Sequence, residues 1–194
     1  MSDKTEKKYM KKSEIVTFGI GLFGVALMTG WMPDYTATFF ADFAFKGKGF
    51  DSATMANAIS MVFLVAGIIG AVCELVIGYL VDNTRTKLGK VKPWVGFGVV
   101  PLAVVAMLVF IAPNTSNQTL AIVWMFVIYS LYTAFSCAVE SPSNCFGSLC
   151  SPNPAERSTA ISIASFLRSV GQSGGMVVAV SYTHLRAHET GRNL

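Results

Sequence analysis

The chain has 194 residues, of which 53% are hydrophobic and only 13% are charged, and its formal net charge is +4. An average soluble domain carries roughly 25% charged residues, so this composition excludes an ordinary water-soluble globular domain. Because the apolar residues are also clustered into long blocks, the sequence predicts an all-α membrane protein.

Five of these blocks reach the roughly 20 residues that a helix needs to cross a bilayer. A basic tail over residues 1–14 comes first. In chain order, the expected spans are residues 15–40, 56–81, 94–112, 120–149 and 160–180. Soluble helical proteins rarely carry five such blocks, so we expect residues 15–180 to form a transmembrane bundle surrounded by a lipid bilayer.

Basic residues gather in every second loop. The N-terminal tail holds five lysines, the loop between the second and third spans holds four basic residues, and the loop between the fourth and fifth spans holds Arg157. The opposite loops hold only Lys46 and Lys48. Because short loops rich in Lys and Arg stay cytoplasmic, this asymmetry predicts a multi-pass protein of the cell membrane with a cytoplasmic N-terminus. It explains the basic tail without a nucleic-acid partner.

The loop between the second and third spans carries more than charge. Residues 78–94 read Gly-Tyr-Leu-Val-Asp-Asn-Thr-Arg-Thr-Lys-Leu-Gly-Lys-Val-Lys-Pro-Trp. Topology alone would explain the basic residues, but not Asp82 or the final Pro-Trp pair. We expect Gly78 to let two helices approach closely. We also expect Asp82 to pair with Arg85 or with a helix end elsewhere in the protein.

Glu74, in the second span, is a candidate functional group. A charge at bilayer depth costs at least about 2.5–3.5 kcal/mol on insertion scales, so acids inside spans are functional hypotheses by default. Gly67, Gly70 and Gly78 share one helix face with Glu74 at helical spacing. A stripe of small residues around one carboxylate predicts that Glu74 faces the interior of the bundle.

Three further charges lie inside the expected spans. Glu140 follows the apolar run of the fourth span, and Asp34 lies in the outer half of the first span. Arg168 is the only charged residue of the fifth span, where Gly171 beside it indicates close helix packing. Arg168 is a candidate to bind a solute or to pair with one of the acids.

The last residues, 181–194, differ in character from the span before them. The string Val180-Ser-Tyr-Thr-His-Leu-Arg-Ala-His-Glu-Thr190 can be encoded by the sequence of a transposon adapter used in short-read sequencing libraries. We therefore interpret residues 181–194 as a non-native tail and set them apart from the fold. Because this tail holds the only histidines, His184 and His188, we expect no metal site and no His-based catalysis in the rest of the chain.

The basic loop fits a known family pattern. Residues 82–94 resemble the D-x-T-R-[ST]-x-x-G-K-x-[KR]-P-W form found between helices two and three of the glycoside–pentoside–hexuronide:cation symporters, a family of the major facilitator superfamily whose best-known member is the melibiose carrier. Gly21-Leu-Phe-Gly24, Asp42, Leu64-Val-Ala66 and Glu140-Ser-Pro142 agree as well. Members have about twelve helices in two six-helix halves. The resemblance therefore implies the first five helices of a major-facilitator-type bundle, an N-terminal fragment whose C-terminal half is missing.

The resemblance also implies roles for individual residues. In transporters of this superfamily the loop between helices two and three is a conformational latch, which corresponds here to the residues Gly78, Asp82, Arg85, Lys87 and Gly89. Acids on helices one, two and four of the family hold the coupling cation and the sugar hydroxyls. This implies cation coupling by Glu74 and Glu140, and solute binding by Glu140, Asp34, Arg168 and Tyr132. An aromatic residue such as Tyr132 is also common in spans as a packing residue or interface anchor.

Three positions depart from the family pattern. Gly70 stands where the family has a second helix-two aspartate, Cys137 stands where the melibiose carrier has a cation-site threonine, and Ala26 replaces the sugar-binding aspartate of helix one. Sodium requires several hard oxygen ligands, whereas burial disfavours the charged form of a single carboxyl group and suits it to binding a proton. The departures therefore favour coupling to H+ through Glu74, with Glu140, over coupling to Na+. No other cofactor is expected.

The resemblance implies a secondary active transporter that carries a small polar solute, a sugar or glycoside, by cation symport and alternating access. A non-sugar solute such as an organic acid or a lysolipid is the first alternative, because one fold carries several substrate classes. A non-transporting multi-span membrane protein is the second alternative. An enzyme is not expected, because residues 1–180 offer no nucleophile–base pair and no metal cluster.

Overall fold

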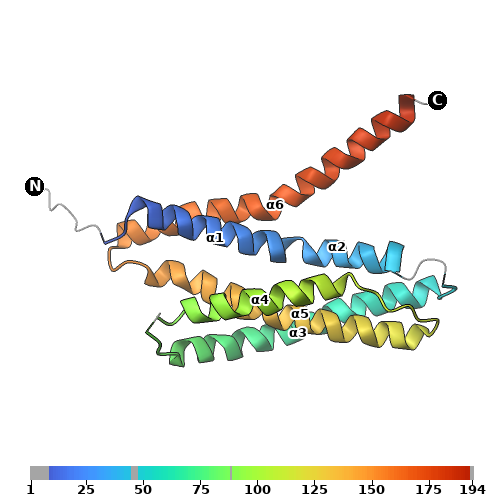
Figure 1. Cartoon of the computed structure of the whole chain (residues 1–194), viewed down its shortest axis with the longest axis horizontal. Coiled ribbons are helices and arrows are strands. Elements are labelled where there is room, and N and C mark those ends of the chain that lie inside the picture. Colours follow the sequence, from blue (N-terminus) through green and yellow to red (C-terminus); the bar gives the residue numbers. More distant parts are fainter. Residues whose placement is uncertain (1–8, 45–47, 88, 193–194) are drawn as a thin grey trace, which may run out of the picture. The chain divides into compact units, whose positions relative to one another are not determined.

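A computed structural model describes residues 9–44, 48–87 and 89–192 of the chain, and the side chains among them other than Ser148 and residues 175–192. No strand occurs in these described ranges. The helices follow one another in the order drawn in Figure 1. They are α1 (Lys12–Gly30), α2 (Met32–Thr38), the π-helix η1 (Phe39–Ala44), α3 (Ser52–Asn83), α4 (Lys92–Val109), α5 (Gln118–Leu149) and α6 (Pro154–Arg192).

Four segments of the described chain are long and apolar enough to cross a membrane. They are Lys12–Ala44, Ser52–Asn83, Lys92–Val109 and Gln118–Gly147, and they overlap the first four predicted spans. The fifth predicted span, residues 160–180, lies inside α6, which is not among these four. The α6 backbone stays helical past residue 180, and the side chains of His184 and His188 lie outside the described residues.

The first span is broken in the middle, which the sequence analysis did not predict. The helix α1 ends at Gly30, and α2 starts again at Met32. Pro33 explains the interruption, because it has no N–H to donate to the carbonyl of Thr29 one turn earlier. The π-helix η1 then extends this span to Ala44, four residues beyond its predicted end.

The chain divides into two compact units. One unit comprises the residues up to Trp31 and those from Gly147 onward, and therefore contains α1 and α6. The other unit runs from Met32 to Phe146 and contains α2, η1, α3, α4 and most of α5.

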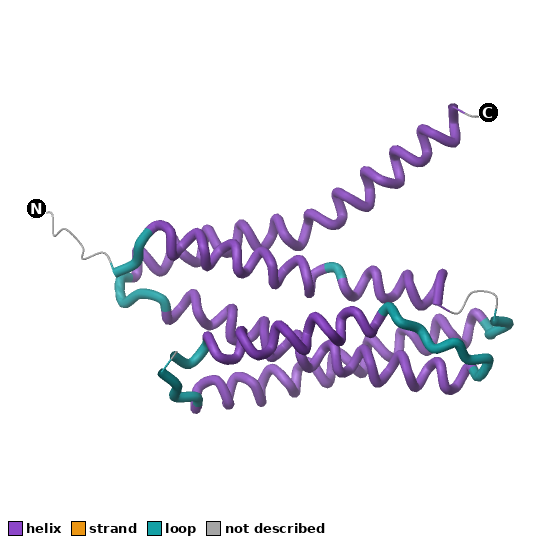
Figure 2. The backbone as a smooth tube through the Cα atoms, viewed as in Figure 1, coloured by secondary structure: helices purple, strands orange, loops and turns teal. Residues whose placement is uncertain are grey.

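In the first unit, α1 lies alongside the N-terminal part of α6 (Figure 2). Small residues line both sides of this contact, as is usual where membrane helices approach closely. We refer to it as the α1–α6 seam, formed by Gly19, Ala26 and Gly30 of α1 with Ala164 and Gly171 of α6.

Gly171 shows how closely the two backbones approach in the seam. A Cβ atom on Gly171 would lie 2.9 Å from the Phe23 carbonyl oxygen and 3.1 Å from the Ala26 Cβ. Just beyond, the indole Nε1 of Trp31 donates to the carbonyl oxygens of Gly171 and Gln172, at 3.1 and 3.0 Å. The predicted close packing at Gly171 is therefore confirmed.

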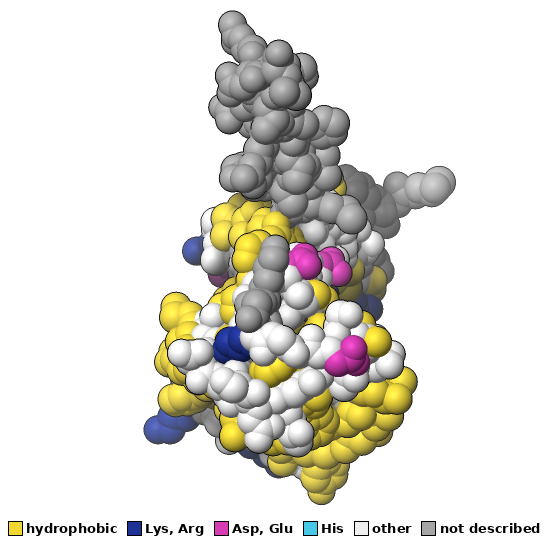
Figure 3. Space-filling model, turned by 90° about the vertical axis from the view of Figure 1, so that its right-hand side faces the viewer, with side chains coloured by type: hydrophobic (Ala, Val, Ile, Leu, Met, Phe, Trp, Pro, Cys, Tyr) yellow, Lys and Arg dark blue, Asp and Glu magenta, His cyan; other side chains and the backbone are white. Residues whose placement is uncertain are grey.

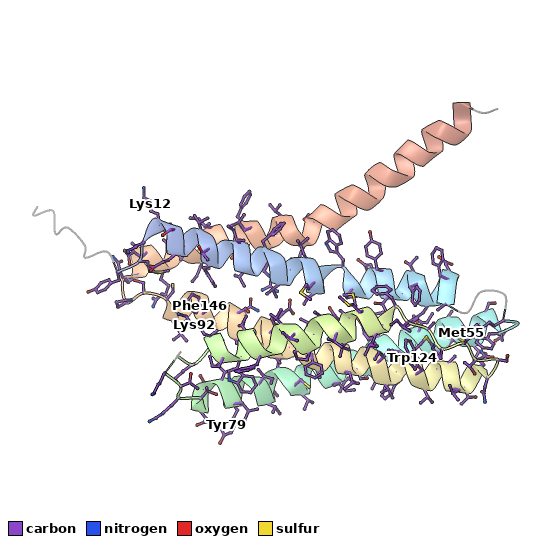
Figure 4. All side chains as sticks on the ribbon, in the orientation of Figure 1. Lys12, Met55, Tyr79, Lys92, Trp124 and Phe146 are labelled. Atoms are coloured by element: carbon purple, nitrogen blue, oxygen red, sulfur yellow. The ribbon has the colours of Figure 1, made fainter. Side chains whose placement is uncertain are left out.

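In the second unit, α3, α4 and α5 run side by side, with α4 antiparallel to the other two (Figure 1). Figure 4 places Tyr79 of α3, Lys92 of α4 and Phe146 of α5 at one end of this unit, and Met55 and Trp124 at the other. The basic loop after α3 therefore lies at the same end as the last turns of α5. This arrangement agrees with the alternation of loops that the sequence predicts.

The outer surface of the helices is apolar. Leu75 on α3 is 77% exposed, and Phe97 on α4 is 81% exposed. In Figure 3, which looks onto one end of the molecule, hydrophobic side chains lie along the lower flanks, and charged side chains are scattered among them. Helices that are hydrophobic all round belong in a large core or a membrane, so this surface fits a bundle that meets lipid.

The loop that precedes α3 ends in a side-chain N-cap. Asp51 is the N-cap of α3, and its carboxylate accepts hydrogen bonds from both the backbone N–H and the hydroxyl of Thr54. These hydrogen bonds hold the pKa of Asp51 below its usual value. In the same loop, the Lys48 ammonium donates to the Pro113 carbonyl oxygen at 3.0 Å.

Candidate functional site

One face of α5 is polar inside an otherwise apolar bundle. Tyr129, Tyr132, Ser136, Cys137 and Glu140 recur at helical spacing on this face. The first four of these side chains are buried, and Glu140 is half-buried. Buried polar groups need hydrogen-bond partners, so this face is the part of the second unit where candidate functional groups are concentrated.

The small hydroxyls on this face are satisfied by their own helix. Ser136 Oγ donates to the Thr133 carbonyl oxygen at 2.8 Å, and Thr133 Oγ1 donates to the Tyr129 carbonyl oxygen at 3.0 Å. Such back-bonding is common for Ser and Thr within helices. The tyrosines, the thiol and the carboxylate are therefore the groups on this face that can serve a ligand or a proton.

A close contact between α3 and α5 lies at Gly70. The Cys137 thiol donates to the Gly70 carbonyl oxygen over 3.6 Å. A Cβ atom on Gly70 would lie 3.1 Å from the Thr133 Cγ2 atom and 3.9 Å from the Cys137 sulfur. The two positions at which the resemblance implies a lost carboxylate and a lost hydroxyl thus contact each other directly.

Two carboxylates flank this contact. Glu74 of α3 and Glu140 of α5 both lie within electrostatic reach of the Cys137 thiol, as does Cys73. Glu74 follows Gly70 by one turn of α3 and Glu140 follows Cys137 by three residues of α5, so both residues of the predicted coupling pair lie near this contact. Among the side chains that the structure describes, no group of three or more His, Cys, Asp or Glu is arranged to hold a metal ion.

The glycine stripe around Glu74 lies at the edge of the packed face of α3 instead of at its centre. Gly70 is buried, but Gly67 and Glu74 are exposed. Gly78 has no atom within 4 Å of a Cβ placed on it, among the described residues. The close helix approach expected at Gly78 is therefore found about two turns earlier, at Gly70.

Asp34 and Tyr132 belong to the same polar region. Asp34 is exposed on α2 and lies within electrostatic reach of Tyr129. The Tyr129 ring packs against Phe63 of α3, with ring centroids 4.5 Å apart, and against Tyr132 at 5.7 Å. Tyr132 in turn lies within electrostatic reach of Glu140. Asp34 and Tyr132 are predicted solute-binding residues, whereas Phe63 has no such predicted role.

The remaining predicted solute-binding residue, Arg168, lies in the first unit. It is half-buried on α6, one turn after Ala164 and three residues before Gly171, and so beside the α1–α6 seam. Ala26, which takes the place of the helix-one acid of the family, is fully buried inside that seam. The seam leaves no space for a larger side chain at this position.

The basic loop after α3 is a compact turn. Thr84 ends α3, and its hydroxyl oxygen accepts a hydrogen bond from the Trp94 indole Nε1 at 2.9 Å. Gly89 adopts a φ of +92°, which favours glycine, and its N–H donates to the Thr86 carbonyl oxygen at 3.0 Å. The Thr84–Trp94 contact explains part of the loop sequence that topology alone does not.

The charged residues of this loop point away from it. Asp82, Arg85 and Lys87 are exposed. No ion pair joins Asp82 to Arg85 in the described part of the chain, so that one of the two expected pairings for Asp82 is not formed. These side chains are free to contact another surface on this side of the bundle.

Known proteins resemble this chain over most of its length. The profile of the family described as MFS/sugar transport protein matches residues 17–192. The inner membrane symporter YicJ of Escherichia coli is 30% identical over 125 residues, which cover 64% of this chain and 26% of that protein. The symporter YjmB of Bacillus subtilis is 29% identical over 180 residues, covering 92% of this chain and 36% of that protein.

A third relative is named for its solute. The isoprimeverose transporter of Lactiplantibacillus pentosus is 33% identical over 117 residues, covering 60% of this chain and 24% of that protein. The chain thus spans between 24% and 36% of the length of these three relatives, which are transporters and not enzymes. This chain therefore belongs to the MFS/sugar transport protein family of the major facilitator superfamily, within the glycoside–pentoside–hexuronide:cation symporters.

Proposed function

We propose that this chain is the N-terminal part of a secondary transporter that carries a sugar or glycoside together with a cation. Its family membership and its relative named for isoprimeverose transport support a sugar as the solute. The fraction of each relative that it spans supports a further C-terminal part, and we call the whole the complete transporter. In this transporter, two helical halves would rock around a site at the bilayer midplane.

The coupling ion that the site favours is a proton. The preference for a proton over sodium rests on the contact between the Cys137 thiol and the Gly70 carbonyl oxygen. A soft sulfur occupies the space where sodium would need hard oxygen ligands. Glu74 lies one turn after Gly70 on α3 and Glu140 lies three residues after Cys137 on α5, so two carboxyl groups near this contact are candidates to carry the proton.

Coupling requires that the ion and the solute both prefer one conformation of the transporter. A bound ligand shifts a conformational equilibrium only by its difference in affinity for the two states. We propose that protonation of Glu74 and Glu140 favours the state in which Glu140, Tyr132 and Asp34 bind the solute. Arg168, in the first unit, stays a predicted solute-binding residue.

The basic loop would act as a latch on the cytoplasmic side. Asp82, Arg85 and Lys87 are exposed and are candidates to contact the C-terminal part of the complete transporter. Gly89 and the Thr84–Trp94 hydrogen bond would fix the shape of the turn that presents them. This role requires a cytoplasmic N-terminus, which is the orientation that the positive-inside rule predicts, and we propose the cell membrane as the location.

The experiment that tests the proposal is uptake of labelled sugars into vesicles that contain the complete transporter. An inward proton gradient should drive accumulation, and an inward sodium gradient of the same size should not. Vesicles with the Glu140→Gln variant serve as the comparison, because this variant keeps the shape of the side chain and loses the titrating group. Accumulation that follows sodium and ignores the proton gradient would refute proton coupling.

A specific observation favours a second solute class. Ala26, at the position of the family's sugar-binding acid, is sealed inside the α1–α6 seam. A transporter without this acid has lost a hydrogen-bond acceptor for sugar hydroxyls, so an organic acid or a lysolipid is the runner-up. If unlabelled organic acids or lysolipids inhibit uptake and a panel of sugars and glycosides does not, the sugar assignment is wrong.

A further inference from the structure

One fully buried hydroxyl in the second unit has no hydrogen-bond partner. Thr36, in the middle of α2, is 0% exposed, and its Oγ1 atom has no partner among the residues that the structure describes. The Oγ atom of Ser130 on α5 also lacks a partner there, but that residue is only half-buried. A buried polar group without a partner destabilises the fold, so the hydroxyl of Thr36 needs an explanation.

The local helix does not force this arrangement. A hydroxyl within a helix can donate to the carbonyl oxygen four residues earlier. Thr38, on the same helix, donates in this way to the Asp34 carbonyl oxygen at 3.0 Å, and Thr133 on α5 does so at 3.0 Å as well. Thr36 has the same option at the carbonyl oxygen of Met32 and does not use it. Its hydroxyl is therefore enclosed on the buried face of α2 with its donor and acceptor unused.

Ring contacts place this part of the chain against the start of α5. The Phe39 ring meets the Phe110 ring at the end of α4 edge-on, with centroids 5.3 Å apart. The Phe40 ring meets the Trp124 ring of α5 edge-on, with centroids 6.2 Å apart. The helices α2 and η1 thus run toward the end at which α4 finishes and α5 begins (Figure 1), and they are antiparallel to α5.

This register brings Thr36 to the level of the polar face of α5. Thr36 precedes Phe40 by four residues, and Tyr129 follows Trp124 by five. At about 1.5 Å per residue, the two lie about 6 Å and about 7.5 Å further along from the Phe40–Trp124 contact. The electrostatic reach between Asp34 and Tyr129 agrees with this placement. The unpartnered hydroxyl therefore lies level with the end of the polar face that begins at Tyr129.

The helix that carries Thr36 is interrupted on both sides. Pro33 marks the break that precedes it, α2 itself has 7 residues, and the π-helix η1 follows. Interrupted helices form the solute sites of many secondary transporters, and π-helical turns are frequent at functional sites. The interruption and the unpartnered hydroxyl are independent observations, and both single out α2 as an element that binds a ligand.

We propose that Thr36 is a solute-binding residue whose hydroxyl exchanges hydrogen bonds with one hydroxyl of the sugar. This inference rests on the proposed sugar transport and deepens it, because it names a residue that reads the position of a single sugar hydroxyl. The solute reaches Thr36 in the conformation that uncovers this face of α2, as alternating access requires. Because the Thr36 hydroxyl has no internal hydrogen bond to break, the new bond adds fully to affinity.

The first test measures binding by calorimetry. The purified complete transporter is titrated with the methyl glycosides of galactose, glucose and xylose and with their monodeoxy analogues. We expect Thr36→Val to weaken binding of the parent glycoside about three- to tenfold, which corresponds to one neutral hydrogen bond. Thr36→Ser keeps the hydroxyl and should bind like the unaltered transporter. Thr38→Val is the matched control, since the Thr38 hydroxyl is exposed and bonded to its own helix.

The monodeoxy analogues separate a solute contact from a structural role. One analogue should bind the unaltered transporter about three- to tenfold more weakly than its parent does. The same analogue should bind Thr36→Val as well as the parent does, because the partner of the missing hydroxyl is gone. A substitution that only disturbs packing would weaken the parent and every analogue alike, and that result would refute the proposal.

Thermal stability supplies a readout that needs no solute. Thr36→Val removes a buried unpaired hydroxyl and keeps the shape of the side chain. The thermal midpoint of the solute-free transporter should therefore rise by a few degrees. Thr38→Val should give no such rise, because the Thr38 hydroxyl is already bonded. A fall of the midpoint in Thr36→Val would mean that the hydroxyl has a partner in the solute-free protein, and it would overturn the proposal.

The contact at Thr36 and the proposed function can fail separately. If a glycoside binds and Thr36→Val binds it with unchanged affinity, the contact is refuted and sugar transport stands. If no glycoside binds the unaltered transporter, the sugar assignment fails, and the same variants are titrated with succinate and citrate. Weaker binding of the acid in Thr36→Val but not in Thr36→Ser then supports Thr36 as a solute-binding residue, and equal affinity refutes it.

Discussion

The α1–α6 seam and the α3–α5 contact are built with the same type of residue and serve different purposes. In both, a glycine allows two helices to approach: Gly171 in the seam and Gly70 in the α3–α5 contact. Each contact also includes a position at which the family resemblance implies a missing acid. In the seam that position, Ala26, is enclosed by apolar packing, whereas Gly70 lies beside a thiol and two carboxylates.

The comparison shows that loss of an acid has different consequences at the two places. At Ala26 the neighbouring helix has filled the space, so the function of the acid cannot be regained by one substitution. At Gly70 the surroundings are still polar, so polar groups remain there, although they are of a different type from the acid that was lost. The predictions below test this difference, beginning with the largest expected effect.

Ala26→Asp should prevent folding of the seam. Ala26 is fully buried, and the Cβ atom that it already carries would lie only 3.1 Å from a Cβ on Gly171. A carboxylate buried there without a partner should cost about 3 kcal/mol or more. We expect a loss of monodisperse protein in size-exclusion chromatography after detergent extraction. Ala26→Ser, which is nearly as small and uncharged, is the control, and normal folding of Ala26→Asp would contradict the enclosed seam.

Gly171→Ala should destabilise the seam less severely. The added methyl group would lie 2.9 Å from the Phe23 carbonyl oxygen, so backbone has to move. Overpacking of this kind costs about 1–3 kcal/mol, and the thermal midpoint of the purified protein should fall accordingly. The matched control is Gly21→Ala on α1, where no atom lies within 4 Å. There the better helix propensity of alanine should leave stability equal or raise it by up to about 1 kcal/mol.

Gly70→Asp combined with Cys137→Thr should make uptake respond to sodium. The double variant returns a carboxylate and a hydroxyl to positions in contact, and so supplies hard oxygen ligands. The Thr133 methyl group, 3.1 Å from a Cβ on Gly70, has to give way by only a few tenths of an ångström. We expect sodium to stimulate sugar uptake several-fold in the complete transporter. Gly70→Ala adds the Cβ atom without the oxygens, and a sodium response in that control would show that the oxygens are not responsible.

Sequence patterns predicted the helices well because each depends on local composition. The long apolar blocks identified four segments that can cross a membrane, and Gly171 correctly indicated close packing. Pro33 marks the break at Trp31, whereas the apolar block around it predicts a single helix. Gly78 was expected to be a contact point and is not one among the described residues.

The partners of each side chain were beyond sequence reasoning. Cys137 donates to Gly70, which lies 67 residues away, and Trp31 donates to Gly171 across 140 residues. Periodicity says which face of a helix is polar, but not which residue of another helix meets it. For this reason the pair Glu74 and Glu140 could be proposed from the sequence, whereas the contact of Tyr129 with Phe63 emerged only from the packing of α5 on α3.

The smallest effect is expected at the start of α3, outside both contacts. Asp51 accepts hydrogen bonds from Thr54, which hold the pKa of Asp51 below its ordinary value of 3.8. A lowered pKa in the folded state means that the ionised form stabilises the helix start. This stabilisation is complete above the ordinary pKa and is lost as the pH falls through the lowered one. Hydrogen exchange at the Thr54 amide should therefore show weaker protection below about pH 4.

Asp51→Ala should abolish this pH dependence, and Thr54→Val should reduce it by removing the hydroxyl partner alone. Because the cap lies at the end of α3 opposite the basic loop, neither change should alter the sodium response of the Gly70→Asp and Cys137→Thr variant. Any such alteration would mean that the end of α3 and the α3–α5 contact move together.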